Sequence, residues 1–151
     1  MTTSHKIPIS VLVVIHTPDL QVLLMERADH PGYWQSVTGS QNPGETLRET
    51  AIREVAEETG LDASQFVLTD RDQQNVYEIY PEWRHRYAPG VEHNTEHVWS
   101  LTLPAPLPVK LAAQEHLRFA WHPYQEAAQR CFSPSNADAI LMLPKWSASS
   151  H

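Results

Sequence analysis

The sequence predicts one α/β domain, because strand-like and helix-like segments both occur within a chain of one domain's length. The chain has 151 residues, of which 41% are apolar. That is enough for a core without disulfides or a structural metal. Apolar, β-branched runs alternate with turn residues, and one long segment without Gly or Pro is rich in helix-forming residues. We therefore expect residues 1–151 to form a single domain.

The first strand is predicted over Ile9–Ile15, where β-branched residues are nearly continuous. Such a run is typical of a strand that is buried on both faces. Pro18-Asp19 breaks it, and Val22–Met25 then resumes an apolar run. The two segments are expected to pair as a hairpin across this turn.

A long helix is predicted over 45–59. The preceding residues, Gly39–Gly44, are expected to form a tightly folded loop. The helix should end at Gly60, because Gly is favoured just after the last helical residue.

The second half of the chain predicts two further strands, a connector and a compact C-terminal part. Residues 69–80 and 97–103 have strand composition, and the segment between them, rich in His, Arg, Pro and Gly, is expected to be a functional loop. The expected elements that follow are an extended connector over 104–108, a strand over 119–121, a helix from Pro123 to about Arg130, and a last helix capped by Ser135-Asn136 that runs through 139–142.

Composition excludes several classes of partner. The formal net charge of −7 disfavours binding to nucleic acid. The longest strongly apolar run, Val11–Ile15, is far shorter than the roughly 20 residues that span a bilayer, so no membrane association is expected. A single cysteine, Cys131, cannot form an internal disulfide and is expected to be a small buried residue. With no secretory signal recognisable at the N-terminus, the expected compartment is the cytoplasm.

The predicted helix over 45–59 is unusually acidic. Glu54, Glu57 and Glu58 fall within an arc of about 100° on one helical face, beside an apolar arc that contains Ala51 and Val55. Like charges four residues apart destabilise a helix, so a hard divalent cation is expected to compensate them. A solvated charged face is the alternative for a generic acidic helix.

The spacing around this helix is more specific than its charge. Gly39, five residues, Glu45, seven residues and then the run from Arg53 to Leu61 together resemble the Nudix box, with every fixed position filled. The resemblance to the Nudix hydrolases implies an α/β/α sandwich around a mixed β-sheet. It also implies a loop–helix–loop metal site and the hydrolysis of a nucleoside diphosphate that is linked to another group. A helix that carries this box is expected to bind metal.

The resemblance assigns roles to the residues of the box. It implies that Glu54 and Glu58 bind Mg²⁺, for which Mn²⁺ can substitute, and that Glu57 is a further ligand or orients water. Arg53, four residues before Glu57, is the implied electrostatic partner of that carboxylate. Glu45 either touches the metal through water or favours the helix dipole. Gly39 and Gly60 are expected to serve the backbone geometry.

Strings outside the box also resemble one bacterial Nudix subfamily, which removes pyrophosphate from dihydroneopterin triphosphate in folate synthesis. The strings are 34–40, 84–91 and 115–117. This resemblance implies that Glu115 is a metal ligand or a base that orients water. The expected partner is therefore a small-molecule triphosphate.

The expected substrate contacts lie outside the helix. Lys6, Arg27 and Arg84 are expected to neutralise the triphosphate, with Arg86 as a weaker candidate. Further contacts are expected from Glu82 and Trp83 on the pterin ring, and from Thr38 and Ser133.

Two other functions remain open. A pyrophosphatase that cleans purine nucleoside triphosphates would share the box and the triphosphate contacts. A non-catalytic sensor of a phosphorylated ligand would have no need of Arg53 together with three acidic residues. The sequence does not indicate an oligomeric state.

Overall fold

The computed structural model describes residues 5–148, and within them seven strands form one sheet. The order across the sheet is β3, β2, β1, β6, β5, while β4 also pairs with β1 and β7 with β2. Strands β1 and β6 run parallel and the other pairs are antiparallel, so the sheet is mixed. The strands are β1 Ile9–His16, β2 Gln21–Arg27, β3 Trp34–Gln35, β4 Val37–Ser40, β5 Val67–Glu78, β6 His93–Thr102 and β7 His116–Pro123.

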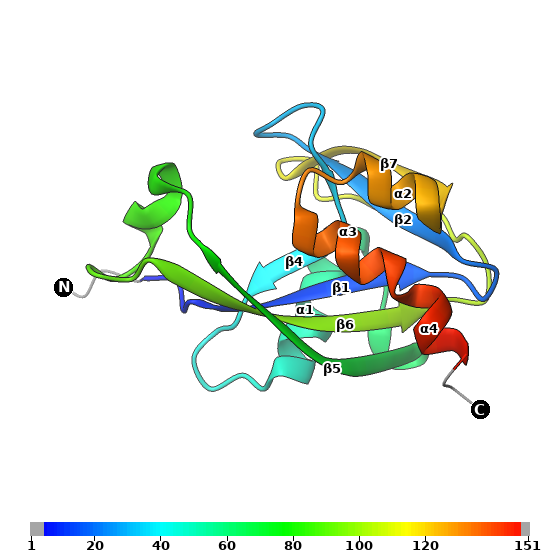
Figure 1. Cartoon of the computed structure of the whole chain (residues 1–151), viewed down its shortest axis with the longest axis horizontal. Coiled ribbons are helices and arrows are strands. Elements are labelled where there is room, and N and C mark those ends of the chain that lie inside the picture. Colours follow the sequence, from blue (N-terminus) through cyan, green and yellow to red (C-terminus); the bar gives the residue numbers. More distant parts are fainter. Residues whose placement is uncertain (1–4, 149–151) are drawn as a thin grey trace.

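Helices cover both faces of the sheet. Helix α1 (Leu47–Thr59) lies on one face, and α2 (Tyr124–Arg130), α3 (Pro134–Leu141) and α4 (Leu143–Ala148) lie on the other (Figure 1). Alternate residues of β1 point to opposite faces. Val11 and Val13 therefore pack toward Val55 of α1, whereas Leu12 and Val14 pack toward Ile140 of α3. The α/β/α sandwich and the doubly buried first strand are both confirmed.

The acidic helix begins two residues later than predicted. Thr46 is its N-cap, and its side chain accepts a hydrogen bond from the backbone N–H of Glu49, whose own carboxylate accepts from the N–H of Thr46. This reciprocal capping box stabilises the first turn, so Glu45 lies outside the helix. Gly60 ends the helix with a φ of 76°, as the sequence predicts.

The first hairpin forms only beside its turn. His16 pairs with Val22, after which β2 separates from β1 and pairs with β7. The freed edge of β1 is taken by β4, from Ser10 opposite Ser40 to Val13 opposite Val37. The prediction of a loop over 39–44 was therefore wrong at its start, since Gly39 and Ser40 belong to β4. This pairing brings Gly39 beneath α1.

The predicted strands in the second half are present with different ends. β6 begins at His93 rather than at 97, and β7 covers His116–Pro123 rather than only 119–121. A short 3₁₀ helix, Pro81–Arg86, lies in the segment expected to be a loop. A second one, Ala63–Gln65, connects α1 to β5.

The C-terminal helices also differ in their starts. Pro123 is the N-cap of α2 rather than its first residue, and α3 starts at Pro134 with Ser133 as its N-cap. Asn136 does not cap this helix: its Oδ1 accepts from the backbone N–H of Ser36, at 2.8 Å, and its Nδ2 donates to that residue's Oγ. Helix α4 was not predicted.

The proline-rich connector runs between β6 and β7 without a helix or strand over 103–115. It is fixed to the body at two points, because Trp121 Nε1 donates to Leu107 O at 3.1 Å and Lys110 N to Thr59 O at 2.9 Å. The second contact leads the connector past the end of α1, and Glu115 follows it. Within residues 5–148, no helix is long and apolar enough to cross a membrane.

Candidate active site

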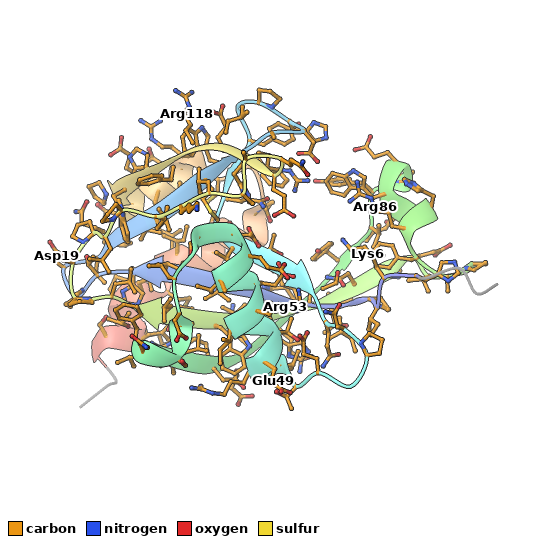
Figure 2. The ribbon with its side chains drawn as sticks, turned by 180° about the vertical axis from the view of Figure 1, so that it is seen from behind. Lys6, Asp19, Glu49, Arg53, Arg86 and Arg118 are labelled. Carbon is orange, nitrogen blue, oxygen red and sulfur yellow. The ribbon has the colours of Figure 1, made fainter. Side chains whose placement is uncertain are left out.

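A cavity of about 600 Å³ lies beside α1 and β4. Its walls come from the N-terminal segment, β1, β4, α1, β6, the 3₁₀ helix 81–86 and the loop before β7. Figure 2 shows Arg53 of α1 on one side, with Lys6 and Arg86 across from it. Segments that are distant in sequence therefore share one cavity.

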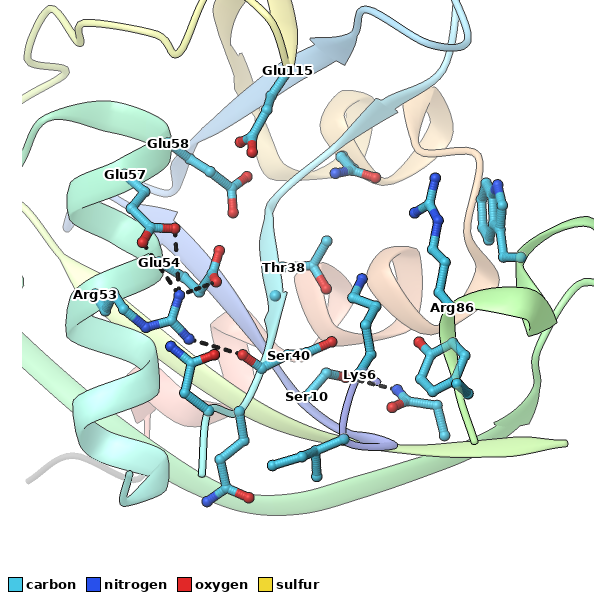
Figure 3. Close-up of a pocket in the computed structure, with 18 of the residues that line it drawn as sticks. Lys6, Ser10, Thr38, Ser40, Arg53, Glu54, Glu57, Glu58, Arg86 and Glu115 are labelled. Carbon is cyan, nitrogen blue, oxygen red and sulfur yellow. Dashed lines mark hydrogen bonds and ion pairs between the residues drawn. The ribbon is translucent and has the colours of Figure 1, made fainter. Parts of the chain in front are cut away.

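Four carboxylates line the α1 side of this cavity. Glu54, Glu57 and Glu58 project from the helix, and Glu115 approaches from the loop before β7 (Figure 3). Glu58 is 2% exposed, and among the residues that the structure describes neither of its carboxylate oxygens has a hydrogen-bond partner. Burial raises the pKa of Glu54 and raises that of Glu58 well above its ordinary value, and the Glu54 charge raises it further.

These carboxylates fit a hard divalent cation. Buried oxygens without a donor, such as those of Glu58, are stabilised by a positive charge. Within residues 5–148, no three His, Cys, Asp or Glu side chains are already gathered tightly enough to hold a metal. Magnesium in proteins commonly takes one or two carboxylates, and water and phosphate oxygens complete its shell. Glu54 and Glu58 suffice for that.

Gly39 leaves the space that Glu54 occupies. A Cβ at position 39 would lie 2.0 Å from Glu54 Cδ and 2.2 Å from its Oε2. Carbon atoms in contact are normally about 3.5–4.0 Å apart, so any side chain here would displace the carboxylate. The φ of Gly39 is not positive. Its role is close approach to Glu54 rather than turn formation.

Arg53 connects the helix to the preceding loop. Its Nε donates to Glu45 Oε2 at 2.7 Å, and its two terminal nitrogens donate to Glu54 Oε1 at 2.6 Å and to Ser40 O at 2.8 Å. Its contacts with Glu57 are longer, at 3.3 and 3.4 Å. The expected pairing with Glu57 is therefore secondary to the pairs with Glu45 and Glu54.

Glu45 is positioned by this arginine. Its Oε1 also accepts from Thr50 Oγ1 at 2.7 Å and from the backbone N–H of Asn42 at 3.0 Å. Hydrogen bonding from Arg53 lowers the pKa of Glu45 to about 2. Glu45 precedes the N-cap, and it interacts with Arg53 and Thr50 of α1 and with Asn42 of the loop.

His116 contacts the carboxylate cluster without adding charge. It is 4% exposed, and its Nε2 lies 3.6 Å from Glu58 Oε1. Burial, reinforced by the nearby Arg27, lowers the pKa of His116 to about 4. The imidazole is neutral at pH 7, so this contact is not an ion pair.

Cations line the opposite side of the cavity. Arg27 is held by a two-bond fork to Asp29, at 2.7 and 2.6 Å, and it donates to Gln35 at 3.2 Å. Lys6 and Arg86 line the same wall. Burial, followed by repulsion from Arg86, lowers the pKa of Lys6.

Trp83 holds two of these cations. The guanidinium of Arg27 lies 5.1 Å from the centroid of the indole, and that of Arg86 lies 5.9 Å from it. Both are within cation–π range. The indole therefore orders two arginines at the cavity wall.

Three expected substrate contacts lie elsewhere. Arg84 is paired with Glu78 and donates to Ile79 O at 3.0 Å, away from the lining of the main cavity. Glu82 lies at a smaller aromatic pocket of about 360 Å³, which Trp83 also borders. Ser133 Oγ is hydrogen-bonded to that of Ser135 at 3.1 Å and does not line the main cavity.

The remaining expected residues lie at the cavity, and others join them. Thr38, Lys6 and Arg27 line it. The sequence analysis did not predict several further lining residues, among them Ser10, Tyr77 and Asn94. A polar Asn in a strand could have signalled the third, but position 94 was expected to be a loop.

Comparison with known proteins identifies the family. The NUDIX domain model matches residues 6–143. Dihydroneopterin triphosphate diphosphatase of Escherichia coli (strain K12) is 44% identical over 139 residues, which are 90% of this chain and 91% of that protein. The Haemophilus influenzae protein of the same name is 42% identical over 135 residues, 87% of this chain and 84% of the other.

Solved structures agree with this relationship. The structure of the E. coli dihydroneopterin triphosphate pyrophosphohydrolase superposes with a TM-score of 0.84 and 43% identity, covering 91% of this chain and 95% of the other. An Ap4A hydrolase from C. elegans has a TM-score of 0.73 at 21% identity, covering 93% and 97%, and shares the fold. With the box residues of α1 gathered at one cavity, the chain belongs to the Nudix family.

Proposed function

We propose that this chain is a magnesium-dependent enzyme of the cytoplasm that hydrolyses dihydroneopterin triphosphate to dihydroneopterin monophosphate and pyrophosphate. The observation that carries this proposal is the 44% identity, over 90% of the chain, to the E. coli diphosphatase of that name. The cavity supports it, because an acidic wall faces a basic wall across a space of about 600 Å³. A metal–triphosphate complex has charges that complement both.

The acidic wall would hold the metal through Glu54 and Glu58, with Glu57 and Glu115 as the nearest further carboxylates. When bound, a divalent cation supplies neutralisation of phosphate charge and lowers the pKa of a bound water. Arg53 fixes the Glu54 carboxylate through its bond at 2.6 Å. Glu115, which is exposed, is the candidate to orient the attacking water.

The basic wall would bind the triphosphate. We assign this role to Lys6, Arg27 and Arg86, with Thr38 as a further contact. Arg86 replaces Arg84 in this set, because Arg84 is paired with Glu78 outside the cavity. Fixed cations of this kind hold the phosphates in line with the attacking water.

A substrate panel tests the proposal. The purified chain is incubated with magnesium and with dihydroneopterin triphosphate, GTP or ATP, and products are identified by mass. We expect pyrophosphate and a monophosphate, with kcat/KM highest for the pterin and no turnover in excess chelator. Equal efficiency for the purine nucleotides would favour the nucleotide-cleaning alternative. Stepwise release of single phosphates would contradict the reaction.

Two variants separate metal binding from helix stability. Glu58→Gln removes the charge of a buried carboxylate and should lower kcat by orders of magnitude. Glu49 lies on the same helix but takes part in its capping box and does not line the cavity, so Glu49→Gln should leave kcat within a factor of about two. A third variant tests the residue outside the helix: Glu115→Gln should lower kcat more than it raises KM.

Parallel titration with Mg²⁺ and Mn²⁺ determines which metal supports turnover.

A further inference from the structure

Asn94 presents a buried carbonyl oxygen that has no donor. The residue lies on β6, is 1% exposed and lines the main cavity. Its Nδ2 donates to Ser10 Oγ at 2.7 Å and to Tyr77 Oη at 3.0 Å. Within residues 5–148, its Oδ1 is buried and has no hydrogen-bond partner. Almost all buried polar groups in folded proteins are paired, so an unpaired acceptor at a ligand cavity requires a reason.

In the structure the nitrogen of the Asn94 amide makes both contacts, and the oxygen is left free. Both protons of the Asn94 amide are donated to hydroxyl oxygens, one on β1 and one on β5. Tyr77 is 41% exposed, but its hydroxyl is turned onto Asn94, and the loss of water around it raises its pKa to about 12. It therefore stays a neutral phenol at pH 7. What the amide offers to the cavity is a neutral acceptor.

A neutral acceptor selects one part of the substrate. Phosphate oxygens carry no proton at neutral pH to donate and are repelled by a carbonyl oxygen, so the triphosphate cannot satisfy Asn94. An amino group or a ring N–H of a neutral heterocycle can. A site that hydrogen-bonds such a group rejects an analogue that lacks it.

The position of Asn94 agrees with this division. Ser10, its partner, pairs in register with Ser40 of β4 and with Glu96 of β6. In Figure 3, Ser10 is drawn toward Lys6, whereas Glu57 and Glu58 lie on the helix side of the cavity. The carboxylates and Asn94 thus occupy different parts of one cavity. A triphosphate that extends from the carboxylates to Lys6 would bring the heterocycle next to Lys6, on the side of the cavity where Ser10 and Asn94 lie.

We infer that Asn94 Oδ1 is a specificity-determining acceptor that recognises the amino edge of a 2-amino-4-oxo fused pyrimidine. Pterin and guanine share this edge, and adenine and hypoxanthine lack its exocyclic amino group. The inference deepens the proposed function and rests on it in one respect, namely that the ligand is a heterocyclic triphosphate. Ser10 and Tyr77 are positioning residues that orient the amide.

A pair of nucleotides isolates this contact. GTP and ITP differ by the 2-amino group alone, and both are measured as substrates and as competitive inhibitors of whichever triphosphate is hydrolysed fastest. For the wild type we expect GTP to be favoured over ITP by about tenfold, the size of one buried neutral hydrogen bond. Asn94→Leu, which has nearly the same volume without an acceptor, should reduce this ratio to about one.

Two further variants control for damage to the fold. Asn94→Asp keeps an acceptor oxygen, which Ser10 and Tyr77 can hold by donating their hydroxyl protons, and should retain the preference for GTP. Asn75→Leu removes an amide on β5 outside the cavity lining, where it donates to Glu96 at 3.4 Å, and should leave the ratio unchanged. Thermal unfolding of each variant confirms folding.

The outcomes are distinct from those that test the proposed function. A wild-type ratio of one for GTP over ITP overturns the role of Asn94 without any variant, even if the pterin triphosphate is the preferred substrate. An unchanged ratio in Asn94→Leu does the same. A preference for xanthosine triphosphate, which has a 2-oxo group, would mean that the amide turns its nitrogen to the ligand, and it would overturn the inference too. Equal use of pterin and guanine with a ratio near ten would contradict the proposed substrate and support Asn94.

Discussion

Replacing Gly39 by alanine should impair catalysis while leaving the fold intact. The added Cβ would lie 2.0 Å from Glu54 Cδ, whereas carbon atoms in contact are about 3.5 Å or more apart. The Glu54 carboxylate must therefore move by about 1.5 Å. Its hydrogen bond from Arg53, now 2.6 Å long, cannot survive a shift of that size in the same geometry.

The expected loss of activity follows from the displacement. A misplacement of about 1 Å at a catalytic group can cost roughly 10²-fold in rate, which is about 2.7 kcal/mol of transition-state stabilisation. We expect at least this loss in kcat/KM for pyrophosphate release, together with a higher magnesium requirement. Stability should change by only about 1 kcal/mol, since the obstructed atoms are the end of a flexible side chain and alanine also lowers the entropy of the unfolded chain.

Gly90→Ala is the matched control. Gly90 has a φ of 86°, and a Cβ added there would meet no atom within 4 Å. Alanine at this position is strained by about 1–2 kcal/mol without touching the site. Thermal unfolding should show the larger loss of stability for Gly90→Ala, and steady-state kinetics the larger loss of activity for Gly39→Ala.

A double substitution tests the cause. In a Glu54→Ala background the obstructed carboxylate is absent, so Gly39→Ala should cost almost nothing further. If the two losses add in full, the effect of Gly39→Ala does not act through Glu54. A wild-type rate for Gly39→Ala alone would refute the steric argument altogether.

Three further predictions, one of them with a matched control, test the surrounding contacts. Arg86→Gln should raise KM by about tenfold because it removes a cavity cation, whereas Arg84→Gln, which lies outside the cavity, should have little effect in the same assay. Arg53→Lys keeps the charge but cannot replace the bonds that the guanidinium donates in several directions, so kcat should fall by roughly 10- to 100-fold in pyrophosphate-release assays. Glu45→Gln should be less stable than wild type above pH 4.5. The gap should close as the pH falls from 4.5 toward about 2, because the folded-state pKa of Glu45 is lowered and its contribution is lost on protonation; urea unfolding across that range would show a constant gap if the reasoning fails.

The acidic helix was predictable because its information is local. Glu54, Glu57 and Glu58 are close in sequence, and a helical period of 3.6 residues places them on one side. The exact start was not predictable from composition, since Glu45 resembles a helical residue until Thr46 is seen to cap the next turn. The structure adds a contact that composition did not indicate, the hydrogen bond from Arg53 Nε to Glu45 Oε2.

Contacts between distant segments were not predictable in this way. Arg84 and Arg86 are two residues apart, and a short 3₁₀ helix turns one toward Glu78 and the other toward the cavity. A segment expected to be a loop gives no rule for choosing between them. The place of Asn94 at the cavity could not be predicted, because it depends on where β6 begins and on contacts with Ser10 of β1 and Tyr77 of β5. Glu115, in contrast, was found through resemblance alone.

The two walls of the cavity bury charged groups of opposite sign. Burial raises the pKa values of Glu54 and Glu58, and the Glu54 charge raises that of Glu58 further, while burial and Arg86 lower the pKa of Lys6. Each shift means that the charged form is held against an unfavourable environment. A cation alone relieves the acidic wall, and an anion alone relieves the basic one. A divalent metal bound to a triphosphate would relieve both at once, which is why the proposed function assigns the complex, and neither part alone, to this cavity.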